Sequence, residues 1–151
     1  NTSSLSALMK IQSVSILRSL FREVVVPSAV FEEFSRYAKL PDFIRTSELT
    51  QGQKARADAL KEMLSPGERE AIILAIDLGD LLVIDERTGR RICEERSVKK
   101  TGTYALIRQA YEDCFISRRD LEEKVRRLKT DLFYENWIIE HVLAAKKPEE
   151  R

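Results

Sequence analysis

Two short apolar runs, each of which ends at a polar turn and passes into a helix, constrain the fold of this chain most strongly. The first is VVVP at 24–27, followed by SAVFEEF, and the second is LLVI at 81–84, followed by DERTGRR. Short strands rich in β-branched residues that alternate with helices are typical of a parallel sheet with helices on both faces. We therefore predict an α/β fold in three layers, with a central, mainly parallel sheet flanked by helices.

The rest of the chain has the pattern of helices joined by short loops. Alternation and turn residues predict strands at 23–26 and 81–84, with shorter ones near 43–46 and 98. Caps and apolar periodicity predict helices at 1–11, 13–21, 27–40, 51–64, 66–78, 86–96, 103–115, 118–128 and 136–145. We expect one domain over 1–151, because a chain of this length buries roughly 70% of its unfolded surface.

Composition disfavours several classes of function. The 26 basic and 25 acidic residues nearly cancel, so no overall charge attracts nucleic acid or a membrane. Cys93 and Cys114 lie outside any CxxC motif, and with one histidine in the chain a zinc site is disfavoured. No apolar run approaches the roughly 20 residues of a membrane span, and no signal peptide is visible. We therefore expect a cytoplasmic protein with no membrane contact.

Helical periodicity separates the acids that face inward from those that face solvent. In helix 27–40, Glu33 falls within the apolar stripe, whereas Glu32 falls on the opposite face. That stripe consists of Val30, Phe34 and Tyr37. In helix 66–78, Glu68 extends the apolar stripe toward the N-terminus, whereas Glu70 and Asp77 are predicted to face solvent. The second stripe consists of Ala71, Ile72, Ala75 and Gly79.

A third acidic position, Asp85 and Glu86, directly follows the apolar run at 81–84. Ligand sites in open α/β sheets lie beyond the carboxyl ends of the strands. Carboxylates that converge there, with few His or Cys, suit a hard divalent cation and phosphate chemistry. The candidate catalytic and metal-ligating acids are therefore Glu33, Glu68, Asp85 and Glu86.

Each of these acids also has a structural interpretation. Ser65-Pro66-Gly67-Glu68 matches a capping box with proline at the first helical position. Asp85 could be the N-cap of the following helix, and Glu86 a first-turn acid favoured by the helix dipole. Glu33 could extend to solvent beside Tyr37. The residues alone leave these alternatives open.

Four segments, taken in order, resemble the PIN-domain superfamily over nearly the whole chain. They are NTSSLSALMKI, VVVPSAVFEEF, PGEREAIILAIDLGDLLVIDERTGRR and TGTYALI. The chain is most similar to prokaryotic PIN-like proteins related to the toxins of VapBC toxin–antitoxin modules. The resemblance implies a ribonuclease that depends on Mg²⁺ or Mn²⁺, with RNA as substrate, an antitoxin protein as a candidate partner, and a homodimer. It also implies a β-strand before residue 1.

The resemblance assigns the acids one by one. Glu33 matches the family's second acid, and Glu68 matches the third. The eighteen-residue step from Glu68 to Glu86 resembles the spacing to the fourth acid, with Asp85 in the same turn. Both Asp85 and Glu86 are therefore candidates for that position.

The first position departs from the family pattern. Asn1 stands where the family carries Asp, and it is followed by Thr2 and Ser3 as in the family. Asn1 is counted among the metal ligands because its carbonyl oxygen can bind a hard cation, and Ser3 is expected to orient a metal-bound water. The alternative function is a catalytically weak or inactive PIN-like module that binds RNA or a protein partner. A receiver-like phosphoacceptor domain is a more distant third.

A basic stretch follows the proposed metal turn and supplies candidates for contact with an RNA backbone. These candidates are Arg87, Arg90, Arg91, Lys99 and Lys100. A solvated helix face explains the same stretch equally well. For the expected homodimer, the short first helices and helix 136–145 offer apolar surface.

Overall fold

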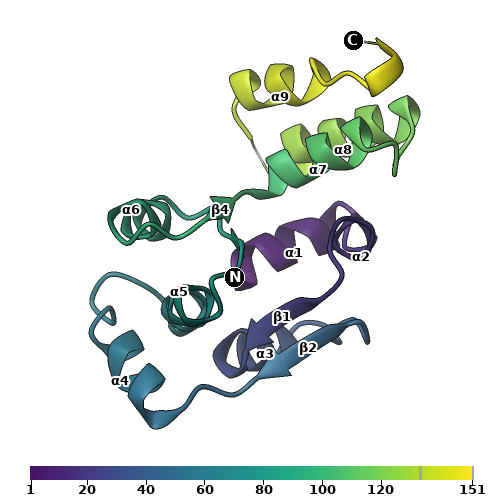
Figure 1. Ribbon diagram of the computed structural model, residues 1–151. Helices are drawn as coiled ribbons and strands as arrows, with labels where there is room; N and C mark the ends of the chain where they lie inside the picture. The colour runs from purple at the N-terminus through teal and green to yellow at the C-terminus, as the bar shows by residue number, and fades with distance from the viewer. Residues whose placement is uncertain (133, 151) are drawn as a thin grey trace. The chain divides into compact units, whose positions relative to one another are not determined.

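The structure, a computed structural model, describes residues 1–132 and 134–150 and confirms the α/β class (Figure 1). Strand β1 (Val24–Pro27) pairs in parallel with β2 (Ile44–Ser47), and β3 (Leu82–Val83) pairs in parallel with β4 (Lys100–Thr101). All four strands lie within three residues of their predicted positions. Among the described residues they form two separate two-stranded sheets.

The chain forms two compact units. The first comprises Asn1–Ser6 and Glu23–Gly102, and the second comprises Ala7–Arg22 and Thr103–Arg151. Helix α1 (Thr2–Lys10) contributes its first residues to the first unit and its last residues to the second. Every predicted acidic candidate belongs to the first unit.

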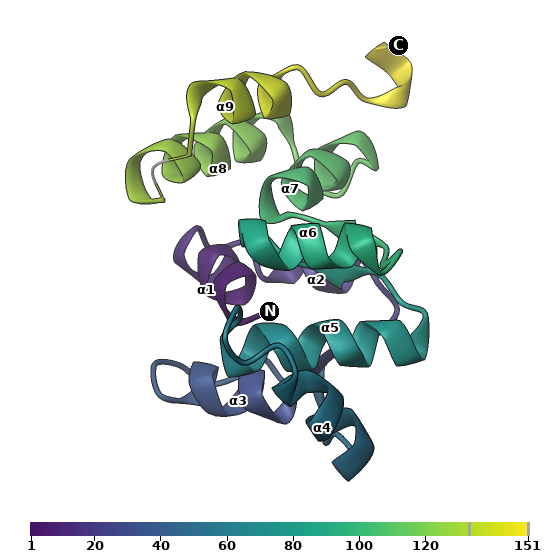
Figure 2. The ribbon, with the colours of Figure 1, turned by 90° about the vertical axis from the view of Figure 1, so that its left-hand side faces the viewer.

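The central helix of the first unit is α5 (Pro66–Leu78), which begins and ends as predicted. Ser65 caps its N-terminus and Pro66 occupies the first turn, while Gly79 ends it in the left-handed conformation with φ 68°. Figure 2 shows α5 with α6 (Arg87–Glu95) on one side, and α3 (Ser28–Ser35) and α4 (Gln51–Asp58) on the other.

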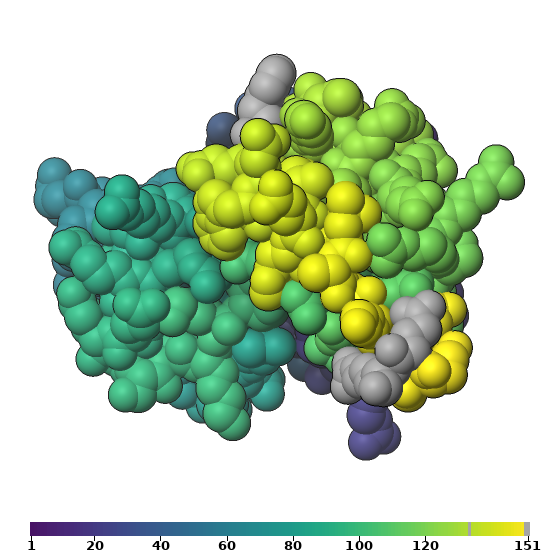
Figure 3. Space-filling model, turned by 90° about the horizontal axis from the view of Figure 1, so that it is seen from above, coloured from purple at the N-terminus to yellow at the C-terminus, as the bar shows by residue number. Residues whose placement is uncertain are grey.

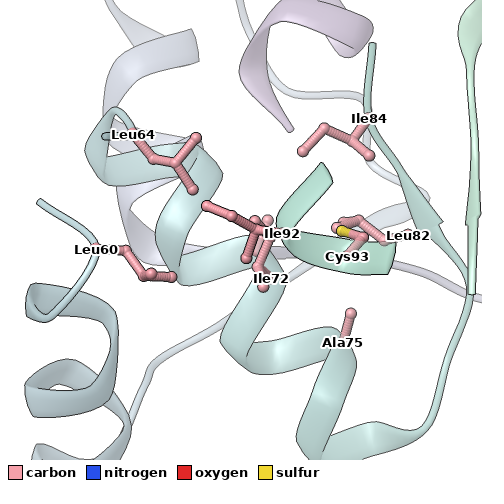
Figure 4. Packing of buried hydrophobic residues seen from close by; sticks show 9 residues of the cluster. Leu60, Leu64, Ile72, Ala75, Leu82, Ile84, Ile92 and Cys93 are labelled. Atoms are coloured by element: carbon pink, nitrogen blue, oxygen red, sulfur yellow. The ribbon is translucent and has the colours of Figure 1, made fainter. Parts of the chain in front are cut away.

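A hydrophobic cluster holds α5, α6 and β3 together (Figure 4). Ile72 of α5, Ile84 beyond β3 and Cys93 of α6 are fully buried, and Leu82 of β3 belongs to the same cluster. Further members of the cluster are Leu60, Leu64, Ala71, Ala75 and Ile92. This packing fixes the end of β3, and with it Asp85, relative to the N-terminal half of α5.

The second unit is helical in the part that the structure describes. It contains α2 (Ser15–Leu20), α7 (Thr103–Glu112), α8 (Arg118–Asp131) and α9 (Asn136–Leu143), followed by a 3-10 turn at Pro148–Glu150. The green-to-yellow surface in Figure 3 is formed by the later elements of this unit. Leu121, Val125 and Leu128 of α8 are buried, as expected for a structural helix.

Two predicted helices end early. Helix α3 ends at Ser35 rather than at residue 40, so Tyr37 is 85% exposed and does not extend the apolar stripe. The polar helix α4 ends at Asp58 rather than at residue 64. In both cases the apolar pattern continued into turns that pack against the core, since Leu40, Leu60 and Leu64 are buried. No helix in the described residues is long and apolar enough to span a membrane.

Candidate functional site

Glu33 connects three helices. Its Oε2 accepts the hydroxyl of Thr2 at 2.5 Å, and its Oε1 accepts the backbone N–H of Gly67 at 2.8 Å. Thr2 opens α1, Glu33 lies on α3 and Gly67 lies in the first turn of α5. The prediction that Glu33 turns inward is confirmed, because its half-buried carboxylate meets two donors instead of extending beside Tyr37.

Gly67 permits this junction because it has no side chain. A Cβ atom at this position would lie 2.7 Å from Glu33 Oε2, 2.7 Å from Thr2 Oγ1 and 3.1 Å from a methyl group of Val30. Distances this short force neighbouring atoms to move. Glycine at this position therefore lets the carboxylate of Glu33 and the hydroxyl of Thr2 take the positions in which they bond.

Glu68 lies in the first turn of α5 and is only 9% exposed. Its Oε2 accepts the backbone N–H of Ser65 at 3.1 Å and the hydroxyl of Ser65 at 3.0 Å, while Ser65 Oγ accepts the N–H of Glu68 at 3.4 Å. The capping box anticipated from the sequence is thus present. The cap uses one carboxylate oxygen of Glu68, so it leaves Oε1 outside its hydrogen bonds.

Asp85 follows the end of β3. Its Oδ2 accepts the hydroxyl of Ser4 at 2.7 Å, while the backbone nitrogen of Asn1 donates to the carbonyl of Val83 at 2.9 Å. The guanidinium of Arg90 donates to the carbonyl of Ile84 at 2.7 Å, which ties α6 to the same strand end. Asp85 is therefore held between the start of α1 and the turn into α6.

The backbone nitrogen of Asn1 is buried, and the carboxylates of Asp85, Glu68 and Glu33 all act on it electrostatically. The side-chain Oδ1 of Asn1 accepts the N–H of Ser4 at 3.2 Å, whereas the buried Nδ2 has no hydrogen-bond partner among the described residues. A buried donor without a partner costs on the order of 1–3 kcal/mol of stability. A group with an acceptor oxygen next to Nδ2 would remove that cost.

The carboxylate of Glu86 is hydrogen-bonded to the helix that it caps. It is the N-cap of α6, and its two oxygens accept the N–H groups of Thr88 at 2.7 Å and Gly89 at 2.5 Å. Desolvation raises the pKa of Glu86, but the hydrogen bonds from Gly89 and Thr88 outweigh it and the pKa is lowered. The sequence left open which acid caps this helix, and the structure assigns that cap to Glu86. Both carboxylate oxygens of Glu86 are therefore used by the cap.

Among the acids predicted to face solvent, the prediction for Glu70 was wrong. Glu32 and Asp77 are exposed as predicted, and Asp77 pairs with Arg56. Glu70 is half-buried, and its Oε2 accepts the N–H of Ala29 in the first turn of α3 at 3.1 Å. The prediction from helical phase was wrong because the phase shows only which side of α5 faces the core. It does not show that a neighbouring helix, α3, begins nearby with an N–H that needs a hydrogen-bond acceptor.

The hydroxyls that contact the acids belong to Thr2 and Ser4. Ser3, predicted to orient a water, is exposed between them. Residues two apart on a helix point in roughly opposite directions, so Thr2 reaches Glu33 while Ser4 reaches Asp85. The run of polar residues at 1–4 indicated the start of a helix. Only the opposite directions of Thr2 and Ser4 on that helix could have indicated that each contacts a different acid. The water-orienting role of Ser3 stays a prediction.

The basic candidates divide into two groups. Arg90 donates to Ile84, Lys100 pairs with Glu94 at 2.9 Å, and Arg91 lies 3.8 Å from Glu95. Arg87 and Lys99 are exposed and make no ion pair within the described residues. These two side chains are the ones that remain available to an external phosphate.

The oxygen atoms around Asn1 suit a hard divalent cation as ligands, although they do not form a complete coordination shell. In the described residues, no three His, Cys, Asp or Glu side chains are already grouped as a metal site. The available ligands are nevertheless all oxygens, from Glu33, Glu68, Asp85 and the amide of Asn1. Neither Glu33 nor Glu68 forms an ion pair with Lys or Arg in that part of the chain. Their negative charge is therefore available to a cation.

Comparison with known proteins gave one match. A family model described as a PIN domain matches residues 1–146, a range that includes every candidate acid. No curated protein and no solved structure matches the chain.

Replacement of Glu86 by Gln tests its structural role. Because its pKa is lowered in the folded protein, ionised Glu86 stabilises the fold above its ordinary pKa of 4.5, and this contribution is lost as the pH falls through the folded value. We expect Glu86→Gln to reduce the free energy of unfolding by about 1 kcal/mol at neutral pH. The difference should shrink as the pH falls below 4.5.

Urea unfolding of both proteins across this pH range measures the effect, and Glu95→Gln at the other end of α6 is the matched control. An unchanged stability at neutral pH combined with weaker Mn²⁺ binding would identify Glu86 as a ligand instead of a cap.

Proposed function

Because this chain belongs to the PIN-domain family, whose members are generally nucleases, we propose that it is a ribonuclease that depends on Mg²⁺ or Mn²⁺. The observation that supports this most strongly is that Glu33, Glu68 and Asp85 all act electrostatically on the backbone nitrogen of the half-buried residue Asn1. Clustered carboxylates repel one another and are costly to bury without compensation. A divalent cation would remove that cost.

In this proposal, Glu33, Glu68 and Asp85 hold the ion, with the amide oxygen of Asn1 as a neutral fourth ligand. When bound, Mg²⁺ or Mn²⁺ supplies a Lewis acid that lowers the pKa of water and neutralises charge on a phosphodiester. Glu86 stays a candidate ligand from the family spacing, although its hydrogen bonds favour its role as a cap.

The other residues of the site orient these ligands. The hydroxyl of Thr2 and the N–H of Gly67 restrain the carboxylate of Glu33, and the hydroxyl of Ser4 restrains that of Asp85. Together these hydrogen bonds would keep both carboxylates in place for a bound cation.

For the RNA backbone, we propose contacts through Arg87 and Lys99, which carry exposed charges without an ion pair in the described residues. Arg90, Arg91 and Lys100 are weaker candidates because each has a partner within its own unit. Loss of a phosphate contact reduces the salt dependence of binding by about one charge. An unchanged salt dependence for the variants Arg87→Ala and Lys99→Ala would therefore exclude these contacts.

Neutral variants of the three acids test the metal site. A unit charge about 4 Å from a cation is worth several kcal/mol at an effective dielectric of about 20, before desolvation. We therefore expect Glu33→Gln, Glu68→Gln and Asp85→Asn each to weaken Mn²⁺ binding at least about tenfold in calorimetry, and to reduce RNA cleavage. Addition of EDTA should abolish cleavage.

Glu32→Gln is the matched control, because Glu32 is the exposed neighbour of Glu33 on the same helix. The proposal would be refuted by Glu33→Gln and Glu68→Gln proteins that are folded and bind Mn²⁺ as tightly as the parent.

The alternative, a weak or inactive module that binds RNA or a protein partner, rests on Asn1 in place of an acid. If Asn1 is a ligand position, Asn1→Asp supplies the missing charge and should tighten Mn²⁺ binding by about tenfold or more. Nuclease activity should rise together with the affinity. Calorimetry and an RNA cleavage assay measure the two effects, with Asn136→Asp in α9 as a control for the same change in charge.

A parent protein that neither binds Mn²⁺ nor cleaves RNA, but that gains both properties in Asn1→Asp, would establish the alternative for the natural chain. If Asn1→Asp bound the metal no better than the parent, Asn1 would not be a ligand.

The family resemblance also suggests the toxin of a toxin–antitoxin pair, with an antitoxin protein as partner, and a homodimer. Exposed apolar side chains of the second unit, among them Trp137 at 57% exposure, offer surface for association. Light scattering that shows a monomer at tens of micromolar would contradict the dimer. Growth that is unaffected by expression of the chain would contradict the toxin role.

A further inference from the structure

Helix α3 lacks a cap of its own. Its N-cap residue is Pro27, which makes no side-chain hydrogen bond to the first turn. Three other helices of the chain, α4, α5 and α8, are closed by complete capping boxes from their own sequence. In α3 the carboxylate of Glu70, from α5, accepts the N–H of Ala29 at 3.1 Å. The first turn of α3 is thus capped by another helix.

The reverse contact also exists. Glu33 of α3 accepts the N–H of Gly67, in the first turn of α5, at 2.8 Å. Helices α3 and α5 therefore exchange carboxylates, each giving one acidic side chain to the N-terminal turn of the other. Two such bonds at separate points of a helix pair fix both the rotation and the axial position of one helix against the other.

This fixation matters for the orientation of Glu33. The carboxylate of Glu33 and the hydroxyl of Thr2 fit against Gly67 with no room for even a methyl group. A small rotation of α3 would therefore break the contacts of Glu33 with Thr2 and Gly67. The bond that opposes such a rotation at the N-terminal end of α3 is the one from Ala29 to Glu70.

We propose that Glu70 is a positioning residue for the metal site: by capping α3 in place of a residue of its own, it holds Glu33 toward Thr2 and Asn1. The inference rests on the proposed function, because it assumes that Glu33 binds a divalent cation. Glu70 itself does not touch the ion, and it acts through the helix that carries Glu33.

Two variants of Glu70 separate positioning from charge. Glu70→Gln removes the negative charge but keeps an oxygen of the same reach for the N–H of Ala29. Glu70→Asp keeps the charge but shortens the side chain by one methylene, so the contact is lost. We expect Mn²⁺ affinity, measured by calorimetry on the full chain, to fall about tenfold in Glu70→Asp and to change less than about twofold in Glu70→Gln.

The order of the two affinities decides the inference. Glu70→Asp must bind Mn²⁺ more weakly than Glu70→Gln, and any other order overturns the positioning role. The reverse order would mean that Glu70 acts only through its charge. Equal affinities, even with a lower melting temperature, would mean that the cap stabilises the fold without orienting Glu33.

Glu33→Gln and Glu32→Gln complete the comparison. If Glu33→Gln leaves Mn²⁺ binding unchanged, the proposed function fails at Glu33, whatever the variants of Glu70 do. If Glu33→Gln weakens binding while both variants of Glu70 match the parent, only the positioning inference fails. Glu32→Gln removes the charge of an exposed acid on α3, the helix that carries Glu33. This variant should bind Mn²⁺ like the parent.

Discussion

The contact on which the site depends is the junction of Thr2, Glu33 and Gly67. A single carboxylate accepts a hydroxyl from α1 and a backbone N–H from α5 while it is carried by α3. Hydrogen bonds to a charged acceptor are stronger than neutral ones, and here they join segments that are far apart in the chain. The missing side chain of Gly67 leaves room for the carboxylate of Glu33 and the hydroxyl of Thr2 to meet there.

Acidic side chains in this protein have two kinds of surroundings. Asp77 and Glu94 are exposed and paired with Arg56 and Lys100, and Glu86 is satisfied by N–H groups of its own helix. The three acids that act electrostatically on Asn1, by contrast, have hydroxyls and backbone N–H groups as their hydrogen-bond donors. Departures of this kind from what stability alone favours are expected at functional sites.

The sequence was most informative where a local signal has one structural outcome. Ser65, Pro66 and Gly79 determine the ends of α5, and the same signals fix the position of Glu68. It was least informative where the partner is distant. The role of Glu70 depends on the uncapped start of α3, and the roles of Thr2 and Ser4 depend on acids brought near by tertiary packing. The prediction that Tyr37 extends the apolar stripe was wrong for a third reason, because the apolar pattern continued past the end of α3.

The separation in sequence between the parts of the site has a consequence for biosynthesis. Asn1 and Ser4 bond to residues 82 and 81 positions later, at Val83 and Asp85. Synthesis runs from the N-terminal to the C-terminal side, so these contacts cannot form until the turn after β3 has left the exit tunnel. Residues 1 to 4 therefore lack these partners while the segment between them and β3 is being made. In the proposed ribonuclease, such an order of assembly keeps the site incomplete until the turn that carries Asp85 has emerged.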